Sequence, residues 1–174
     1  MLASLTLPAA LPTTPATLTV RRAERTDLAA IVRLLTDDAV SASRGDEADE
    51  GAYARGLEAI LADPGNDLVV ATDGDGAVVG TLQLTLIPGM ARGGSTRLLV
   101  EAVRVDGSRR SGGVGTALMR WVTHVAAPEL GAALVQLTSD ARRADAHRFY
   151  ERLGFADSHV GFKYRVPPVG DAGR

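Results

Sequence analysis

The feature that most constrains the fold is a strand, a glycine-rich loop and a helix that follow one another in the middle of the chain. Leu98–Val105 is apolar apart from Glu101 and Arg104, which predicts a central strand of a sheet. Gly107–Gly115 is basic and has little side-chain bulk. From Val114 onward, apolar residues recur every three or four positions, as on one face of a helix. A sheet with helices packed on it accommodates this order, so we predict a mixed α/β fold.

The remaining segments supply the other elements. Runs of apolar or alternating residues predict strands at Leu18–Arg22, Leu68–Ala71, Val78–Leu86, Ala133–Leu137 and Phe162–Val166. Helical spacing predicts a helix capped by Asp27, a second around Tyr53–Leu61 and a third at Asp145–Leu153, which Gly154 ends. Asp73–Gly76 is typical of a hairpin turn, so the two strands beside it should be antiparallel. We expect loops at Ala42–Glu50 and Pro88–Ser95, the second of them mobile.

Length and composition restrict the classes of protein. A chain of 174 residues with 45% hydrophobic and 23% charged residues is expected to form one globular domain, at residues 18–166. Residues 1–17 contain three prolines and no Lys or Arg, so we expect a flexible tail rather than a signal peptide, with a second tail at 167–174. The net charge of -2 does not favour nucleic acid, and no apolar run is long enough to span a membrane. The absence of cysteine fits a cytoplasmic location.

The loop before the central helix has the properties of an anion-binding site. Backbone N–H groups at a helix N-terminus attract anions, and glycines let a diphosphate approach the main chain. The residues expected to take part are Arg109, Arg110, Ser111, Gly112, Gly113, Val114, Gly115 and Thr116. A flexible turn with solvated arginines is the alternative. Two common phosphate motifs are excluded, because the loop lacks the lysine of a P-loop and the third glycine or alanine of a dinucleotide-binding fingerprint.

Two segments carry a resemblance to a known family. Arg110-Ser111-Gly112-Gly113-Val114-Gly115 resembles the phosphate-binding signature Gln/Arg-x-x-Gly-x-Gly/Ala of GNAT N-acetyltransferases, and a second family feature recurs in Ala146–Phe155. The order of elements from Thr19 to Val166 is also similar to that family. The resemblance implies a mixed, mostly antiparallel sheet flanked by helices and splayed at the site of acetyl-CoA. It also implies that the backbone of Val103 and Val105 binds the pantetheine arm.

One subgroup is more similar still. Arg143–Tyr150, continuing to Ser158-His159 and Phe162, resembles the aminoalkylphosphonate N-acetyltransferases. Most GNAT proteins carry Asn at the position of Arg143, where it contacts the cofactor, whereas Arg fits this subgroup. The resemblance suggests an amine that bears an anionic group. Arg92 and Arg97 are then candidates to hold the anion, and solvation at the rim is their alternative. His159 is a further candidate for the amine site, with an exposed loop histidine as its alternative.

Glu101 is the candidate general base. It is a carboxylate on an otherwise apolar strand, which is unfavourable without a purpose, and it aligns with the acidic residue that many relatives use as base. The alternative is a salt bridge to Arg92, Arg97 or Arg104. Direct attack on a thioester, which the resemblance implies, needs such a base to deprotonate the amine.

Tyr150 is the candidate general acid. It matches the tyrosine that relatives place near the cofactor sulfur, and a phenol is a suitable proton donor to a leaving thiolate. The alternative is a core aromatic residue on a helix stripe.

With both Glu101 and Tyr150 in place, we expect an acetyl-CoA-dependent N-acetyltransferase that acts on a small-molecule amine and forms a homodimer. A protein N-terminal or lysine acetyltransferase and an inactive acyl-CoA-binding regulatory domain remain alternatives. The three histidines are scattered, so no metal is expected.

Overall fold

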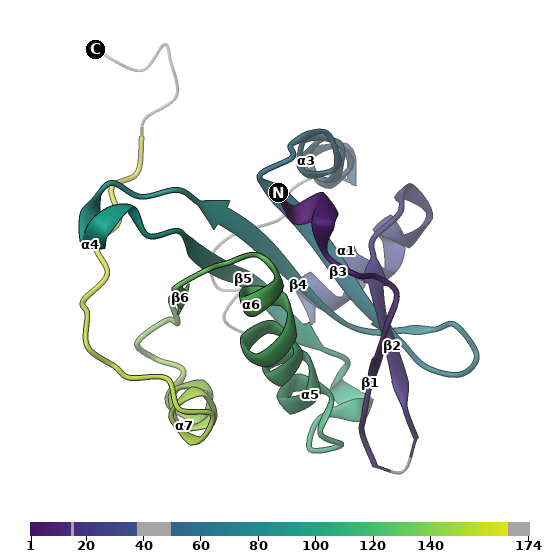
Figure 1. Cartoon of the computed structure of the whole chain (residues 1–174). Helices are drawn as coiled ribbons and strands as arrows, with labels where there is room; N and C mark the ends of the chain where they lie inside the picture. Colours follow the sequence, from purple (N-terminus) through teal and green to yellow (C-terminus); the bar gives the residue numbers. More distant parts are fainter. Residues whose placement is uncertain (15, 38–49, 167–174) are drawn as a thin grey trace, which may run out of the picture. The chain divides into compact units, whose positions relative to one another are not determined.

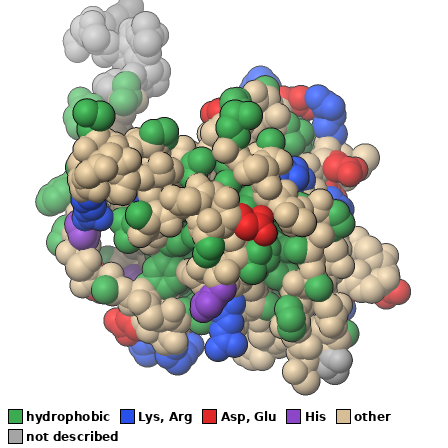
Figure 2. Space-filling model, in the orientation of Figure 1, with side chains coloured by type: hydrophobic (Ala, Val, Ile, Leu, Met, Phe, Trp, Pro, Cys, Tyr) green, Lys and Arg blue, Asp and Glu red, His purple; other side chains and the backbone are tan. Residues whose placement is uncertain are grey.

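The computed structural model describes residues 1–14, 16–37 and 50–166 of the chain (Figure 1). It divides into two compact units, Met1–Leu137 and Thr138–Arg174. No helix in the described ranges is long and apolar enough to cross a membrane. The face drawn in Figure 2 mixes acidic, basic and hydrophobic side chains, as the small net charge leads one to expect.

The first unit is built on a curled six-stranded sheet with the order β1-β2-β3-β4-β5-β6 (Figure 1). Its strands are β1 (Ala9–Leu11), β2 (Leu18–Arg22), β3 (Asn66–Thr72), β4 (Val78–Ile87), β5 (Arg97–Val105) and β6 (Leu134–Leu137). All neighbouring pairs are antiparallel except β5 and β6, which are parallel. The mixed, mostly antiparallel sheet predicted from the sequence is therefore confirmed, with β5 in its interior.

Helices cover both faces of this sheet. The elements between β2 and β3 are a short 3-10 turn, η2 (Arg25–Asp27), and the helices α1 (Leu28–Thr36) and α3 (Glu50–Ala62). After β5 come η3 (Gly107–Arg109), α5 (Val114–Trp121), a π-helical turn η4 (Val122–Ala126) and α6 (Ala127–Glu129). A further turn, α4 (Ala91–Gly94), lies between β4 and β5.

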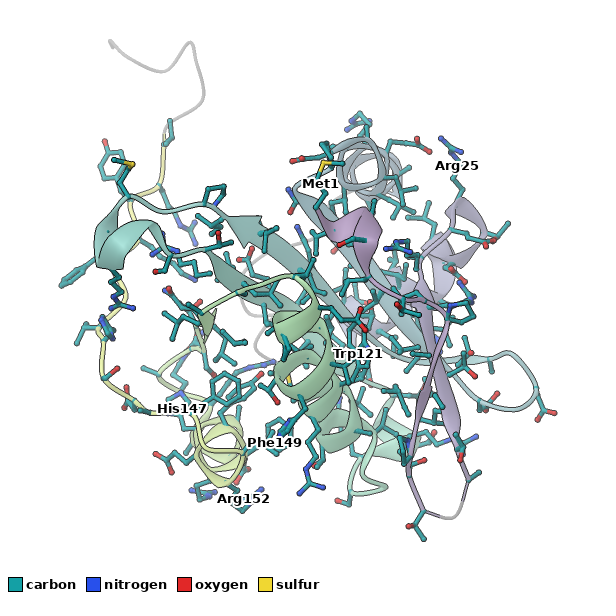
Figure 3. The ribbon with its side chains drawn as sticks, in the orientation of Figure 1. Met1, Arg25, Trp121, His147, Phe149 and Arg152 are labelled. Atoms are coloured by element: carbon teal, nitrogen blue, oxygen red, sulfur yellow. The ribbon has the colours of Figure 1, made fainter. Side chains whose placement is uncertain are left out.

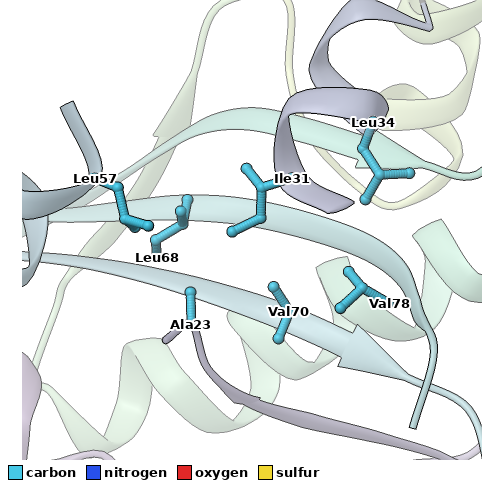
Figure 4. Close-up of a cluster of buried hydrophobic side chains, with 7 residues drawn as sticks. All are labelled: Ala23, Ile31, Leu34, Leu57, Leu68, Val70 and Val78. Atoms are coloured by element: carbon cyan, nitrogen blue, oxygen red, sulfur yellow. The ribbon is translucent and has the colours of Figure 1, made fainter. Parts of the chain in front are cut away.

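The apolar stripes of α1 and α3 bury one face of the sheet. Ile31 and Leu34 from α1 and Leu57 from α3 pack against Leu68 and Val70 of β3 (Figure 4). This packing removes the apolar sides of both helices from water, which is the main stabilising contribution in a domain of this size. It also fixes which side chains of the sheet face α1 and α3.

α5 covers the opposite face. The apolar side chains of that face are almost completely buried, and they include Leu82, Leu84, Leu98 and Val100 of the strands. Leu118 of α5 is buried as well. Gly80 of β4 allows this close approach, because a Cβ there would meet the Leu118 side chain at 3.1 Å and the Arg104 carbonyl oxygen at 3.2 Å. α5 is therefore held tightly against the strands whose ends form the candidate site.

The N-terminal segment differs from the expected tail. Met1–Leu11 contains the 3-10 turn η1 (Leu2–Ser4) and the strand β1, which pairs with β2. Leu2, Leu5 and Leu11 are 1%, 4% and 1% exposed. The expectation of a flexible segment is wrong over these residues, because three leucines at the edge of the sheet bury enough apolar surface to order the chain.

The second unit contains the helix α7 (Ala144–Arg152) and, in its described part, no strand. The strand predicted at Phe162–Val166 is absent: Phe162, Tyr164 and Val166 are each more than 80% exposed. Alternating residues favour a strand only where a neighbouring strand accepts their hydrogen bonds, and the pattern alone does not supply that neighbour. Residues 42–49 of the expected loop and the tail expected at 167–174 lie outside the described residues.

Candidate active site

The loop between β5 and α5 leaves a group of backbone N–H donors unpaired. Ser111 and Gly113 have φ angles of 65° and 81°, in the left-handed region, and this turn directs the chain into α5. The first bond that α5 makes to the loop runs from the Ala117 N–H to the Gly113 carbonyl oxygen, at 2.9 Å. The N–H groups of residues 113–116 donate to no other described residue, and no side chain caps the helix. These unpaired donors are the feature on which the predicted anion-binding site depends.

A hollow of about 380 Å³ lies against these donors. Ser111, Gly112, Gly113 and Thr116 form one wall. Pro12–Thr14, from the loop between β1 and β2, and Arg120 of α5 also line the hollow. Sequence reasoning missed Pro12–Thr14, because it assigned them to a tail and no local pattern marks them as part of a site.

The two arginines of the loop are each paired with a carboxylate. Arg109 donates through Nη2 to Asp73 Oδ2 at 2.9 Å. Arg110 donates through Nη2 to the Asp37 carbonyl oxygen at 3.0 Å and to Asp37 Oδ2 at 3.4 Å. Both guanidinium groups remain more than half exposed. Each has five N–H donors, so these contacts leave donors for a phosphate.

Asp106 shapes the start of the loop. Its carboxylate accepts hydrogen bonds from the Ser108 N–H at 2.9 Å and the Ser108 hydroxyl at 2.6 Å, and it pairs with Arg33 of α1. The Arg33 guanidinium and then Ser108 hold the pKa of Asp106 well below its ordinary value. The carboxylate therefore stays ionised and ties the loop to α1.

Glu101 lies in the middle of β5, directly opposite Gln83 of β4. Directly opposed residues in an antiparallel pair share a face. Since Gln83 is opposite Leu68, which packs with α1 and α3, the Glu101 side chain lies on that same face. It is exposed and forms no ion pair with any described residue. The salt bridges to Arg92, Arg97 or Arg104, weighed as its alternative role, are not formed in the described structure.

The strand changes its geometry immediately after Glu101. Ala102 has a φ of 51°, and the register with β4 shifts between Thr81 and Gln83, which is a β-bulge. Pairing with β6 ends at Val100 and Leu137, so residues 101–105 have no β6 partner. Val103 and Val105, expected to bind a pantetheine arm, lie in this part of the strand. Bulges are frequent beside active sites because they redirect side chains.

Arg143 and Tyr150 belong to the second unit. Arg143 precedes α7, and its carbonyl oxygen accepts the His147 N–H at 3.1 Å. Tyr150 is half-buried and packs edge-on against Phe149 and Phe155, with ring centroids 5.1 and 5.8 Å away. Figure 3 shows His147, Phe149 and Arg152 spaced around this helix.

The helix α7 ends as predicted. Gly154 has a φ of 88°, and the Phe155 N–H donates to the Tyr150 carbonyl oxygen while the Gly154 N–H donates to that of Glu151. This pattern is a Schellman motif, in which only glycine adopts the left-handed conformation without strain. It fixes the backbone on the C-terminal side of Tyr150.

The residues expected at the amine site are dispersed. Arg97 opens β5 and is exposed, and Arg92 lies in α4 with a φ of 56°. The Pro88–Ser95 segment, expected as a mobile loop, thus contains a defined turn. His159 is exposed in the second unit, where its Nδ1 lies 2.8 Å from the Ser158 hydroxyl. Across the part of the chain that the structure describes, no three His, Cys, Asp or Glu residues are grouped as a metal site.

Comparisons with known proteins agree with this architecture. The model described as "Acetyltransferase (GNAT) family" matches residues 28–155. The aminoalkylphosphonate N-acetyltransferase of Salmonella typhimurium is 32% identical over 119 residues, which are 67% of this chain and 73% of that protein. The family and the subgroup resemblance inferred from the sequence are thus confirmed.

Solved structures give the same result. The crystal structure of a transcriptional regulator from Bacillus halodurans C-125 has a TM-score of 0.79 and 38% identity, over 86% of this chain and 99% of that one. An acetyltransferase from Trypanosoma brucei has a TM-score of 0.66 and 25% identity, again over 86% and 99%. Together with the sequence matches, these likenesses show that the chain belongs to the GNAT family and is an acetyl-CoA-dependent N-acetyltransferase.

Proposed function

We propose that this enzyme transfers the acetyl group of acetyl-CoA to a primary amine of a small molecule, and that the amine attacks the thioester directly. The observation that carries the proposal is the state of Glu101. It is an exposed carboxylate on a central strand, it has no cationic partner in the described structure, and it lies where β5 separates from β6. A small-molecule amine is supported by the aminoalkylphosphonate N-acetyltransferase that the chain resembles.

The β5–α5 loop is the proposed binding site for the diphosphate of acetyl-CoA. The unpaired N–H groups at the start of α5 match the oxygens of a diphosphate, and the exposed edges of Arg109 and Arg110 add charged donors. We assign the backbone of Val103 and Val105, which β6 does not reach, to the pantetheine arm. The Val103 carbonyl oxygen also accepts a hydrogen bond from Arg104 Nη1 at 2.9 Å. We also assign Arg143 to cofactor binding, on the basis of the subgroup resemblance.

Two side chains divide the proton transfers. Glu101 accepts a proton from the amine, directly or through a water, and the neutral nitrogen then forms a bond to the thioester carbonyl carbon. When the carbon–sulfur bond breaks, Tyr150 protonates the leaving thiolate. As the tetrahedral intermediate collapses, its nitrogen loses its second proton, which restores the Tyr150 hydroxyl directly or through water, and Glu101 returns its proton to solvent. The products are an N-substituted acetamide, free CoA and one proton, so atoms and charge balance without an enzyme-bound acetyl group.

The experiment is a thiol-release assay with acetyl-CoA and a panel of amines. Release of CoA that depends on added amine, and that falls in Glu101→Gln, supports the proposal. Two results contradict it. Release only with peptides would indicate a protein acetyltransferase, and binding of acetyl-CoA without release for any acceptor would indicate an inactive regulatory domain. Arg92, Arg97 and His159 remain candidates for the amine site in this scheme.

The cytoplasmic location and the homodimer are also part of the proposal. A chain with no cysteine is compatible with a reducing compartment. Light scattering on the purified protein, over a range of concentrations, measures the assembly. A mass of one chain, 18.1 kDa, at every concentration would contradict the homodimer.

A further inference from the structure

A cavity of about 160 Å³ lies between α1, α3 and the sheet. Three of the side chains that line it, Ile31, Leu57 and Leu68, belong to the buried cluster and point toward one another (Figure 4). Among the described residues, the lining includes no charged side chain. Several lining residues, including Val32, Tyr53 and Ile60, are only half-buried, so the cavity reaches the surface between the two helices.

The floor of this cavity is next to the proposed base. Gln83 and Ala102 line it, and Gln83 is the cross-strand partner of Glu101. The cavity and the carboxylate therefore lie on one face of the sheet and share a border at the bulge.

Most of the polar groups in the lining are already used within the protein. The Thr81 hydroxyl donates to the Val69 carbonyl oxygen at 2.9 Å, and the Gln83 side-chain amide donates to Asn66 Oδ1 at 3.1 Å. The side-chain oxygen of Gln83, Oε1, has no donor among the described residues and is available to an N–H group. The site thus offers an acceptor at its edge and apolar surface elsewhere.

We propose that the acceptor amine carries an uncharged, apolar group about the size of a benzene ring, and that this group occupies the cavity while the nitrogen lies between Gln83 and Glu101. The inference rests on the proposed function and names its substrate class. An apolar cavity of about 150 Å³ in another protein binds benzene, which sets the size. A phosphonate in the same place would be desolvated without a partner, since neither Arg92 nor Arg97 lines the cavity.

Gly56 gives independent support. It lines the cavity from the middle of α3, and a Cβ built on it meets no atom within 4 Å. Glycine is less favourable than alanine inside a helix, and no close packing requires it here. The sequence therefore places a weaker helix former in the lining of the cavity, at a position with open space for a side chain.

The test is a series of unbranched primary amines from ethylamine to pentylamine, at matched concentrations of the neutral form. Burial of one methylene corresponds to about a fourfold gain in kcat/KM, so we expect about that gain per added carbon until the cavity is filled. Gly56→Leu should fill the cavity and remove this dependence. Ala59→Leu is the matched control, because Ala59 is an exposed residue of α3 outside the cavity, and it should retain the dependence.

Two results overturn the inference and leave the acetyltransferase proposal intact. One is equal kcat/KM along the series in the wild-type protein. The other is a more than tenfold preference for 2-aminoethylphosphonate over ethanolamine that Arg97→Ala removes, which would support the anion-binding role of Arg97. Failure of every amine to release CoA would instead contradict the proposed function. Thermal unfolding with benzylamine and without acetyl-CoA then tests the cavity alone. Benzylamine should raise the Tm of the wild-type protein and leave the Tm of Gly56→Leu unchanged. No rise in the wild-type protein would contradict binding in the cavity.

Discussion

Replacing Gly113 by valine should abolish binding of acetyl-CoA while the protein remains folded. Gly113 has a φ of 81° at the entrance to α5, and its own Cβ position meets no atom within 4 Å. A side chain there projects into the space that we assign to the diphosphate. The substitution itself introduces strain, because a residue with a Cβ in the left-handed region costs about 1–2 kcal/mol. For a domain of this size, that is a fall in Tm of roughly 2–8 °C.

The assay is thermal unfolding with and without acetyl-CoA. At about 100 times its Kd, acetyl-CoA should stabilise the wild-type protein by roughly 2.7 kcal/mol, or about 5–10 °C in Tm. Gly113→Val should show almost none of this shift. Gly131→Val is the matched control: Gly131 has a φ of 64° and an open Cβ position, but it follows α6 at the other end of the helical segment. The control should lose similar stability and keep the full shift. A full shift in Gly113→Val would refute the assignment of the diphosphate to this loop.

Three further predictions concern single side chains. Tyr150→Phe removes only the hydroxyl, so kcat should fall about 10²–10⁴-fold while the Kd of acetyl-CoA stays unchanged. Turnover near the wild-type value would show that Tyr150 only packs in the core. Glu101→Gln should lower kcat/KM by a similar factor at neutral pH and less at high pH, where more of the amine is already neutral, and a pH-independent loss would contradict a role as base. The hydrogen bonds and charge of Arg21 lower the pKa of Asp27, so the pair stabilises the fold above the unfolded pKa of Asp and loses its effect as pH falls through the lower, folded value. Asp27→Asn should therefore lower the free energy of unfolding by about 1.5–3 kcal/mol at pH 7 and by much less near pH 2, and an equal loss at both values would contradict this assignment.

The sequence predicted the parts of the fold that depend on local pattern. Leu18–Arg22 forms β2 with the expected bounds, and the helix that Gly154 ends has the expected C-terminal motif. The turn before α5 also lies where the sequence predicted it. Its role in binding an anion stays a prediction, for which its glycines, its position before a helix and the family signature coincide in one segment. In each case, the determining residues lie within a few positions of one another.

The errors concern features that depend on distant neighbours. Regular alternation along Val78–Leu86 puts Val78 on the same face as Leu82, but a register shift between Ala71 and Thr72 places Val78 with α1 and α3 instead. The strand expected at Phe162–Val166 needs a partner that its own alternation does not specify. Asp27 occupies the predicted position before α1, yet its carboxylate binds the Glu24 N–H and Arg21 rather than the helix. Short-range patterns identify residue types that suit a role, whereas the contact that uses them is set by the tertiary structure.

Strand β5 explains why Glu101, the cavity and the β5–α5 loop occur close to one another. Its alternation gives Leu98 and Val100 to the face that α5 buries and Glu101 to the face with the cavity. The bulge at Ala102 interrupts this alternation at the point where β6 ends, so the strand continues with one edge unpaired. From Glu101 to the end of the strand at Val105 is about 13 Å at an extended rise of 3.3 Å per residue, and the anion-binding loop begins there. A ligand that reaches both Glu101 and that loop must therefore be long and extended and must lie along the unpaired edge. A diphosphate joined to a thioester through a linear arm has this form. This is why we propose that one short stretch of strand and loop both binds the acetyl donor and positions the base.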